Sequence, residues 1–497
     1  SDILKDTLEK LVSLSEEYWS INRSISDSLI NRAFVIISRK KINDSVLIAN
    51  AYHILGKNLV HKREFQNGID TLKKCNKIKQ KFLSDDFKSI SKTLNYIGIG
   101  YNGLRIYDSA FSYYQKAKAP LIENSVFDIN LYLVNLNIAI YYSSIGKYNT
   151  ALSFYDTAYI VLEKSGLIKD STIMSGYYYN YALYTTFTGK LKQANEYYEI
   201  VERIYGALHG HNSIGLAGVK NNQGINSYLG YELSKANLYF KKALDIHSFN
   251  NSKDNENIAS TYYNLSKVYE EEGNLPLTIA SCEKGLSYAP NNDLSLILNN
   301  ILANSYATIG DNVNALKYFN ITLGLLDNEN INPNRKQDVY SDYASFLMNS
   351  GNNNLSLKYY LKSLKEAKGL HGEASDQYAG ILSKIGNYYL VGEKNADSAL
   401  FYYSLSINIY NNNNLDLQGH NRNLVTEKQA EVGYAKANRL KFQQTNNIDY
   451  LLIADTVLNN VLMTLEDISS QLTKNNKLIV IEAMYPIYLL SVENSYD

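Results

Sequence analysis

Apolar residues recur along this chain with the spacing of amphipathic helices, and the helices come in pairs. In the segment from residue 94 to 117, a first set follows i, i+3, i+4 and i+7, and a second set follows the same rule. The first set is Leu94, Ile97, Gly98 and Tyr101, and the second is Tyr107, Ala110, Tyr114 and Ala117. The short stretch between them, residues 103 to 106, predicts a tight turn, so the segment reads as a helical hairpin.

The same pattern repeats nine times at an almost constant interval. A small residue on the first helix marks each unit, at Gly56, Gly98, Ala139, Ala182, Gly224, Ser266, Ala303, Ala344 and Gly386, with intervals of 42, 41, 43, 42, 42, 37, 41 and 42 residues. A second small or helix-compatible residue follows twelve positions later in eight units and thirteen later in the ninth, at Ala399. A fixed period of this size is typical of stacked arrays rather than of a globular enzyme core.

Glycine occupies the turn between the two helices in most units, at Gly146, Gly189, Gly273, Gly310 and Gly351. A glycine after a helix adopts the left-handed conformation without steric cost. The small residues allow the two antiparallel helices to approach closely. Each hairpin leaves one face uncovered, and the next hairpin covers it, so the sequence predicts an all-α solenoid.

This pattern resembles the tetratricopeptide repeat (TPR). The shared features are the small residue at position 8, glycine near 15, alanine at 20 and an aromatic residue at 24, the last being Tyr114, Tyr155, Tyr198, Phe240, Phe319, Tyr360 and Tyr403. The period of about 42 exceeds the usual 34 and resembles the kinesin-light-chain-like subgroup. The resemblance implies a right-handed superhelical α-solenoid with about nine units over residues 46–412.

The two ends differ from the repeats. Residues 1–45 read as two helices that cap the stack, and residues 413–497 read as a long-helix segment. The latter resembles the segment that precedes the protease in bacterial TPR–CHAT (caspase-like) proteins, at Lys436-Ala437, Leu440, Gln444-Thr445, Asp449-Tyr450-Leu451, Ala454 and Tyr485-Pro486-Ile487-Tyr488. The resemblance implies that a CHAT protease would follow, but the sequence stops at Asp497, so no catalytic dyad can be carried over.

Charge and hydropathy narrow the classes of partner. The chain has 49 basic and 49 acidic residues, a formal net charge of zero, and no long run of one sign. We therefore expect no nucleic-acid binding, which requires a basic surface. No apolar stretch appears long enough to span a membrane, so no membrane insertion is expected. The compartment stays open between a bacterial cytoplasm and, if a leader preceded Ser1, the cell envelope.

The sequence lacks the common catalytic and cofactor motifs, including a glycine-rich phosphate loop, G-x-S-x-G and H-E-x-x-H. His209 and His211 in a predicted loop are a weak candidate for a metal pair. Cys75 and Cys282 lie five repeats apart, too far to form a disulfide, and are expected to be buried. We predict no catalysis by this chain, no cofactor and no metal.

An asparagine recurs two residues before the small position in four successive units, at Asn137, Asn180, Asn222 and Asn264. In the TPR pattern this position faces the concave groove, and peptide-binding TPR proteins use asparagine there. A carboxamide both donates and accepts hydrogen bonds, so a ladder of such groups could hold an extended peptide. Tyr179, Tyr263 and Lys267 are the neighbouring candidates for groove contacts. The alternative is that these amides bond to neighbouring helices.

Three functional hypotheses follow. The first is a peptide- or protein-binding sensor region that regulates an appended or partner CHAT protease. The second is a constitutive module that forms homo-oligomers, and the third is a stand-alone peptide-sensing TPR regulator.

Overall fold

Every regular element that the structure describes is helical. The structure is a computed structural model, and it describes residues 2–19, 22–39, 44–289, 293–327, 331–332, 334–413, 422–471, 487 and 490. Within these ranges the chain forms 22 α-helices, one 3-10 turn and one π-helical segment, with no strand. The chain divides into two compact units, residues 1–213 and 214–497.

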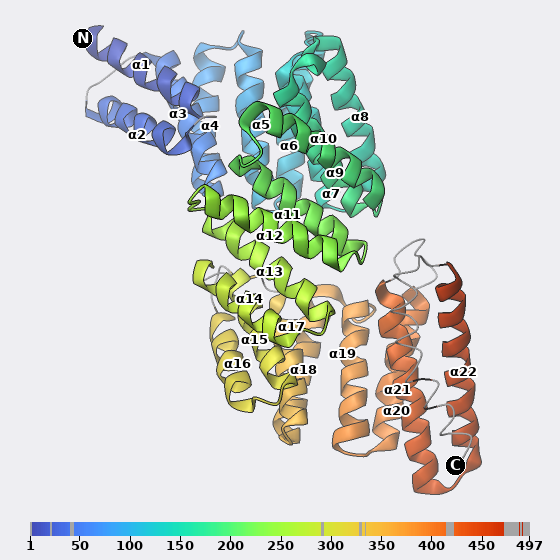
Figure 1. The fold of residues 1–497 in the computed structure, drawn as a ribbon. Helices are drawn as coiled ribbons and strands as arrows, with labels where there is room; N and C mark the ends of the chain where they lie inside the picture. Colours follow the sequence, from blue (N-terminus) through green and yellow to red (C-terminus); the bar gives the residue numbers. More distant parts are fainter. Residues whose placement is uncertain are drawn as a thin grey trace. The chain divides into compact units, whose positions relative to one another are not determined.

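The first unit contains ten helices arranged as antiparallel pairs (Figure 1). They are α1 (Asp2–Tyr18), α2 (Arg23–Arg39), α3 (Ser45–His61), α4 (Phe65–Phe82), α5 (Phe87–Gly103), α6 (Tyr107–Glu123), α7 (Ile129–Ser144), α8 (Tyr148–Ser165), α9 (Ser171–Phe187) and α10 (Leu191–His209).

The second unit continues the same pairing of consecutive helices. Its helices are α11 (Ile214–Leu229), α12 (Leu233–Phe249), α13 (Asn255–Glu271), α14 (Leu275–Tyr288), α15 (Asp293–Thr308), α16 (Asn312–Leu325), α17 (Arg335–Asn349), α18 (Asn353–His371), α19 (Asp376–Asn387), α20 (Ala396–Asn413), α21 (Arg422–Thr445) and α22 (Ile448–Gln471). The all-α solenoid of TPR-type hairpins predicted from the sequence is thus confirmed.

The contact that closes each hairpin joins the small residue of its first helix to a buried side chain sixteen residues later. A Cβ added to Gly98 would lie 2.6 Å from two ring carbons of Tyr114, and one added to Gly224 would lie 2.5 Å from the ring of Phe240. Real Cβ contacts are never this short, so glycine is required where the ring approaches the helix backbone. Where the small residue is alanine, as at Ala139, Ala182, Ala303 and Ala344, its partner sixteen residues on is still buried.

The turn inside each hairpin needs a left-handed residue, and glycine does not always supply it. Gly146, at φ 74°, is a typical example. In the repeats without glycine, the equivalent residues are Arg63, Arg105, Tyr231 and Lys394, with φ between 50° and 65°. Side chains other than glycine, asparagine and aspartate rarely adopt this conformation. These four turns are therefore held by the packing of the helices on either side.

The ninth hairpin carries one extra residue, and the backbone absorbs it locally. Between α19 and the turn, Tyr388–Gly392 forms a π-helical segment, which contains one more residue per turn than an α-helix. This accounts for the spacing of thirteen rather than twelve seen in the sequence. The partner of Gly386 is consequently Tyr403, seventeen residues later, whose ring also contacts Gly433 of α21.

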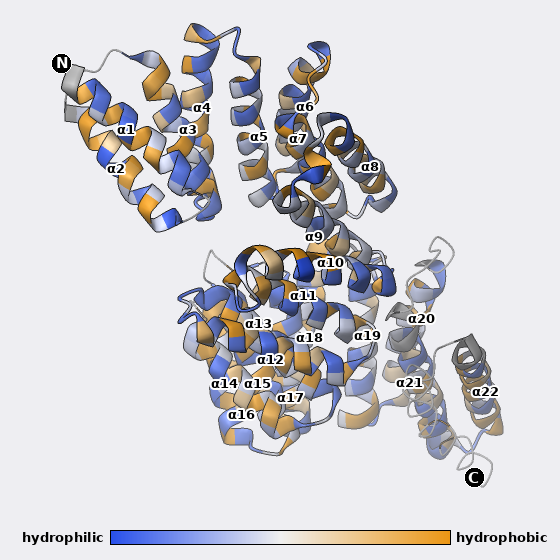
Figure 2. Ribbon diagram, turned by 45° about the horizontal axis from the view of Figure 1, so that its top comes forward, coloured by the Kyte–Doolittle hydropathy of each residue, from blue (hydrophilic) through white to orange (hydrophobic). Residues whose placement is uncertain are grey.

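Alternating hydrophobic and hydrophilic stripes along the helices show why they pack as pairs (Figure 2). The last helix differs, because its stretch Ile448–Glu466 has a mean hydropathy of 1.3 and is one-third buried. By length and composition alone this stretch could cross a membrane, contrary to the expectation that no segment reaches that length. The same composition also suits a helix of a water-soluble protein, and the inner face of α22 packs on α21 through Ala454, Leu458 and Val461.

We expect Gly98→Ala to destabilise the first unit by about 1–3 kcal/mol, because the new methyl group would overlap the Tyr114 ring. Gly176→Ala is the matched control, since nothing lies within 4 Å of a Cβ there. The control should stabilise its helix by about 0.5–1 kcal/mol. Thermal unfolding monitored by circular dichroism distinguishes the two. Equal effects of the two substitutions would contradict the proposed role of this contact.

Candidate functional site

The predicted groove residues of the first unit are engaged in bonds within the protein. The side-chain amide of Asn137 on α7 donates to the Asn95 carbonyl oxygen on α5 at 3.1 Å. The amide of Asn180 on α9 donates to the backbone carbonyl of Gly176, one turn earlier in the same helix, at 2.8 Å. Tyr179 packs edge-on against Tyr198. All three predicted residues are partly buried.

In the second unit, the amide of Asn264 on α13 donates to the Asn221 carbonyl oxygen on α11 at 3.0 Å. This bond repeats the one between Asn137 and Asn95, and each joins the first helices of consecutive hairpins. Asn222, partly buried, lies next to Asn221 on α11. The use of these asparagines as ligand contacts stays a prediction.

Three predicted residues of the second unit lie together at one cavity. Tyr263, Asn264 and Lys267 line a hollow of about 490 Å³ between α11, α12 and α13. The remaining lining residues are Ile225, Tyr228, Leu229, Tyr231, Phe240 and Glu271. The floor is apolar, the walls are aromatic, and the rim carries one amide, one ammonium and one carboxylate group. Cavities of this size and composition typically bind a small molecule or a side chain of a partner.

Two polar contacts fix the rim of this cavity. The Tyr228 hydroxyl donates to the Glu271 carboxylate at 3.0 Å, which adds to burial in raising the pKa of Tyr228. Lys267 pairs with Glu270 one turn later. Burial works to lower the pKa of Lys267, but the hydrogen bond and the charge of Glu270 outweigh it, so the pKa is raised. Lys267 therefore remains a cation at the cavity edge at neutral pH.

Tyr231 reaches this cavity because of its unusual backbone. It occupies the left-handed turn position that is glycine in most repeats, with φ of 55°. Its side chain lines the cavity and is 41% exposed. The sequence offered a signal for this residue, namely a bulky aromatic at a position where glycine recurs. The repeat spacing and the asparagine pattern do not point to Tyr231.

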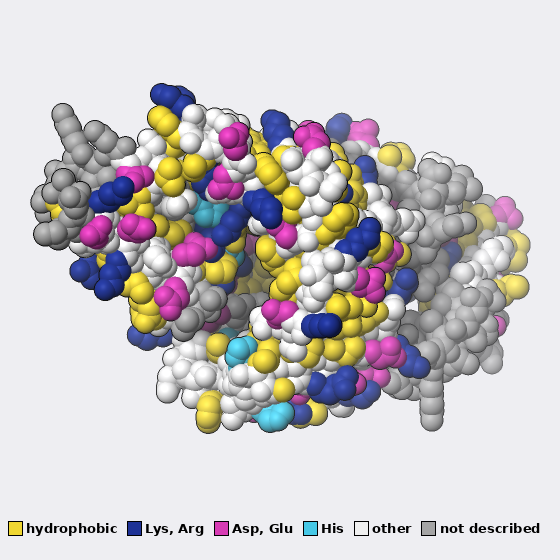
Figure 3. All heavy atoms as spheres, turned by 90° about the horizontal axis from the view of Figure 1, so that it is seen from above, with side chains coloured by type: hydrophobic (Ala, Val, Ile, Leu, Met, Phe, Trp, Pro, Cys, Tyr) yellow, Lys and Arg dark blue, Asp and Glu magenta, His cyan; other side chains and the backbone are white. Residues whose placement is uncertain are grey.

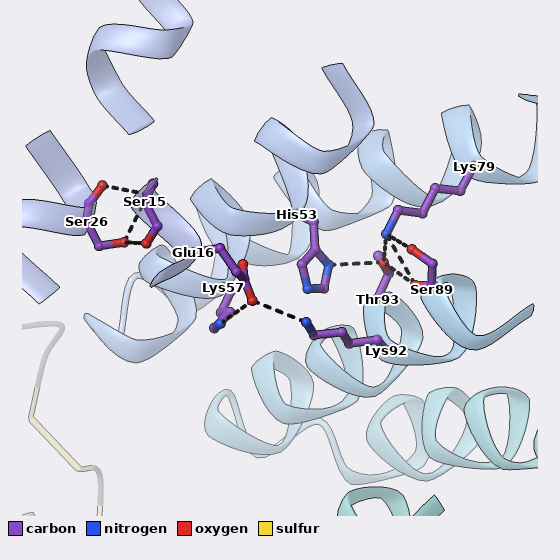
Figure 4. A network of polar contacts seen from close by, with 9 residues as sticks. All are labelled: Ser15, Glu16, Ser26, His53, Lys57, Lys79, Ser89, Lys92 and Thr93. Carbon is purple, nitrogen blue, oxygen red and sulfur yellow. Dashed lines mark hydrogen bonds and ion pairs between the residues drawn. The ribbon is translucent and has the colours of Figure 1, made fainter. Parts of the chain in front are cut away.

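A second cavity, in the first unit, was not predicted. It measures about 810 Å³ and lies between α1, α3, α4 and α5. A network of polar side chains follows its wall (Figure 4). Glu16 on α1 accepts hydrogen bonds from both Lys57 on α3 and Lys92 on α5, each at 3.2 Å. Burial works to raise the pKa of Glu16, but the two lysines outweigh it and the pKa is lowered.

Lys79 of α4 is the most deeply buried charged group of this network, 1% exposed. Its ammonium donates to the Ser89 hydroxyl at 2.6 Å, to the Thr93 hydroxyl at 3.1 Å and to the Ser89 carbonyl at 3.3 Å. Burial lowers its pKa. His53 of α3 meets the same Thr93 hydroxyl through Nδ1 at 3.1 Å. Burial, together with the charges of Lys79, Lys92 and Lys57, holds the pKa of His53 well below its usual value.

The remaining candidates behave as follows. Cys75 and Cys282 are both buried and free, as predicted. Burial raises the pKa of the Cys282 thiol to about 12, so it is not a reactive thiolate. In the part of the chain that the structure describes, no three His, Cys, Asp or Glu side chains are grouped to hold a metal ion. His209 instead packs against Tyr205.

Positive and negative side chains are interspersed on the face shown in Figure 3. The described C-terminal residues add one detail about the segment after α22. Ile487, within the sequence YPIY, is buried against Ala435 of α21 and Leu458 of α22. Tyr485, Pro486 and Tyr488 lie outside the described residues.

Comparison with solved structures supports the class of fold. The apo form of RapI matches at 12% identity over 74% of this chain and 99% of its own, with a TM-score of 0.54. A human IFIT1 dimer with m7Gppp-AAAA matches at 14% identity over 98% and 99%, with a TM-score of 0.50. Apo NprR from B. thuringiensis matches at 18% identity over 73% and 97%, with a TM-score of 0.48. At such identities the likeness concerns the fold, a TPR-type helical-repeat array.

Comparisons of the sequence itself find no relative. No protein-family model matches this sequence, and no curated protein matches it.

We expect the first unit to lose stability as the pH falls below about 6.5, the value at which an unperturbed histidine takes up a proton. Because the pKa of His53 is lowered in the folded state, the full contribution of neutral His53 to the free energy of unfolding is present above pH 6.5. It is lost at lower pH, where the unfolded chain binds the proton first. The loss of stability can be measured from urea unfolding midpoints at pH 7.5 and 5.0, for the wild type and for His53→Asn. Asparagine keeps a hydrogen-bond donor near Thr93. The variant should show the smaller change, and identical changes would exclude His53 as the cause.

Proposed function

We propose that this chain is a non-catalytic scaffold that binds a protein or peptide ligand on its first helices. The observation that carries the proposal is the cavity between α11, α12 and α13, which gathers three residues singled out by the repeat pattern. Aromatic side chains there offer stacking area, while the rim offers an amide, a cation and an anion. This mixture suits the side chains and backbone of a peptide segment.

The charge distribution favours a peptide over a polyanion. The human IFIT1 dimer is described with m7Gppp-AAAA, but its likeness to this chain concerns the fold. The formal net charge here is zero, and Lys267 at the cavity is already paired with the Glu270 carboxylate. Binding of nucleic acid depends on unpaired Lys and Arg side chains of the protein, which contact the phosphate backbone of the nucleic acid. A neutral or mixed-charge peptide is therefore the better match.

The finer proposal is that this scaffold is the sensor region of a CHAT-type protease. It is supported by the residues that resemble the pre-protease segment, among them Ala437, Tyr450 and Ala454. Ala437 and Ala454 are both fully buried in the C-terminal helices α21 and α22. Ligand binding to the repeats would then restrain or release the protease. A stand-alone peptide-sensing regulator uses the same binding surface and differs only in lacking the protease.

A second candidate function is homo-oligomerisation through the C-terminal hairpin. Leu452, Ile453 and Met463 of α22 are exposed, at 60%, 40% and 68%. Apolar side chains grouped on one exposed helix face favour association.

Binding should depend on the walls of the cavity rather than on fold stability. A ligand can be selected from a phage-displayed random peptide library and its affinity measured by calorimetry. Tyr231→Gly should weaken binding about tenfold while leaving stability unchanged or raised, because glycine relieves the left-handed turn. Lys267→Ala should weaken binding as well.

Arg105→Gly provides the matched control, since it makes the same change at the equivalent turn of another repeat. It should leave affinity unchanged. If Tyr231→Gly and Lys267→Ala both keep the full affinity for the ligand, this cavity is excluded as the ligand site. Full affinity in an Asn180→Ala, Asn222→Ala double variant as well would count against the whole groove.

The oligomerisation alternative predicts a specific mass. Size-exclusion chromatography with light scattering should give the monomer mass of 56.3 kDa if the chain is a ligand-binding scaffold. A stable multimer without ligand, converted to monomer by Leu452→Ser with Met463→Ser, would favour the assembly module instead.

A further inference from the structure

The cavity of the first unit has two walls of opposite character. Its inner wall comes from α3, α4 and α5 and contains His53, Lys79 and Lys92. Its outer wall comes from α1 and is mainly acidic. It contains Glu9, Ser13, Glu16 and Glu17, together with Lys5, which pairs with Asp44. At about 810 Å³ the cavity has room for a molecule of several residues' size.

The inner wall carries positive charge that the protein does not neutralise. No carboxylate of the described chain lies within ion-pair distance of the Lys79 ammonium, which bonds to neutral oxygens of Ser89 and Thr93. Lys92 bonds to Glu16 alone, through one of its three donors. Glu16 is shared with Lys57, so one carboxylate faces two ammonium groups. An anionic group of a ligand would complete this arrangement.

His53 adds a requirement for a hydrogen-bond donor. The Thr93 hydroxyl donates its hydrogen to the Ser89 carbonyl at 3.0 Å, so it accepts from Nδ1–H of His53. The neutral ring then carries its lone pair on Nε2, which is buried and has no partner in the described chain. His53 is 5% exposed and lines the cavity. A buried acceptor without a donor is costly, and an N–H group of a ligand would satisfy it.

The outer wall supplies negative charge at the cavity mouth. Glu9, Ser13 and Glu17 lie at i, i+4 and i+8 and therefore on one face of α1. Glu9 and Glu17 are exposed and form no ion pair within the described residues. Asp44 is already engaged, because it pairs with Lys5 at 2.8 Å and accepts from the Leu47 backbone amide. Between the two walls, Val12, Leu47 and Ile54 offer apolar surface.

We propose that this cavity binds a short zwitterionic peptide of two or three residues. Its carboxylate contacts Lys92 in the field of Lys79, and a backbone N–H donates to His53 Nε2. Its ammonium group lies near Glu17, and an aliphatic side chain contacts Val12 and Ile54. The site is separate from the cavity of the second unit and does not depend on the function proposed there.

Simpler ligands match fewer of these features. Inorganic phosphate would satisfy the lysines but would leave the carboxylates of α1 without a partner. A free amino acid carries both charges but lacks the amide N–H between them. A dipeptide carries a carboxylate, an amide N–H and an ammonium group, one for each of the three kinds of partner that line the cavity.

The test is calorimetric titration of the full chain with leucyl-leucine, leucyl-leucinamide, N-acetyl-leucyl-leucine, free leucine and inorganic phosphate. Leucyl-leucine should bind, and each blocked form should bind about tenfold more weakly, the loss expected for one charge-assisted contact. Trp19, the sole tryptophan, gives a local readout by fluorescence. The Lys57 ammonium lies 3.6 Å from its ring centre and pairs with Glu16 of the cavity wall.

Variants assign the contacts. Lys92→Met should lower the affinity for leucyl-leucine about tenfold. Lys88→Met, on the same helix and outside the cavity, should leave the affinity unchanged. Glu17→Gln should lower the affinity for leucyl-leucine. It should leave the affinity for N-acetyl-leucyl-leucine unchanged, because that ligand has no ammonium group. Both Lys92 and Glu17 are accessible, so these variants are expected to fold normally.

Three outcomes would overturn the proposal. One is the absence of leucyl-leucine binding to the wild type at millimolar concentration. Another is equal affinity of leucyl-leucine for Lys92→Met and Lys88→Met. The third is tighter binding of phosphate or free leucine than of the dipeptide. None of these outcomes bears on the cavity of the second unit, whose variants are measured separately.

Discussion

Most of this structure depends on the contact between a small residue on the first helix of each hairpin and a buried side chain on the second. Gly98 and Tyr114 show how close this contact is, because even one added methyl group at Gly98 would overlap the Tyr114 ring. The contact sets how closely the two helices approach, and so determines which residues of the first helix face away from the partner helix. First helices supply Asn264 and Lys267 to one candidate site, and His53 and Lys92 to the other.

Polar bonds between consecutive first helices form the second level of organisation. Asn137 bonds to Asn95 across 42 residues, and Asn264 bonds to Asn221 across 43. Farther along, Asp342 of α17 accepts from Asn300 of α15 at 2.7 Å. These bonds recur at the repeat interval because equivalent positions on neighbouring first helices lie opposite one another. An amide that joins two helices in this way keeps its own carbonyl oxygen for a ligand, so a structural and a binding role are compatible.

The two cavities show how departures from the repeat create specific chemistry. In the second unit, Tyr231 replaces the usual turn glycine and closes one side of an aromatic hollow. In the first unit, Lys79 occupies a buried position of a second helix, where apolar residues are normal. Burying an ammonium group among neutral oxygens is costly unless something further compensates for it. Both Tyr231 and Lys79 depart from the repeat pattern, and each lies at a cavity where a ligand could contribute binding energy.

The sequence alone determined the helical hairpins, their number and their order, because each depends on local spacing: small residues at a fixed interval, apolar faces at helical periodicity and glycine in the turns. It also singled out Tyr263, Asn264 and Lys267 as neighbouring groove candidates, and the structure brings these three to one cavity. The partners of the asparagines and the cavity of Lys79 and His53 were decided by the tertiary structure. Asn137 and Asn95 lie 42 positions apart, and His53 and Thr93 lie 40 apart, each pair on different helices. Hydrophobic periodicity carries no information about which polar groups meet across such an interface.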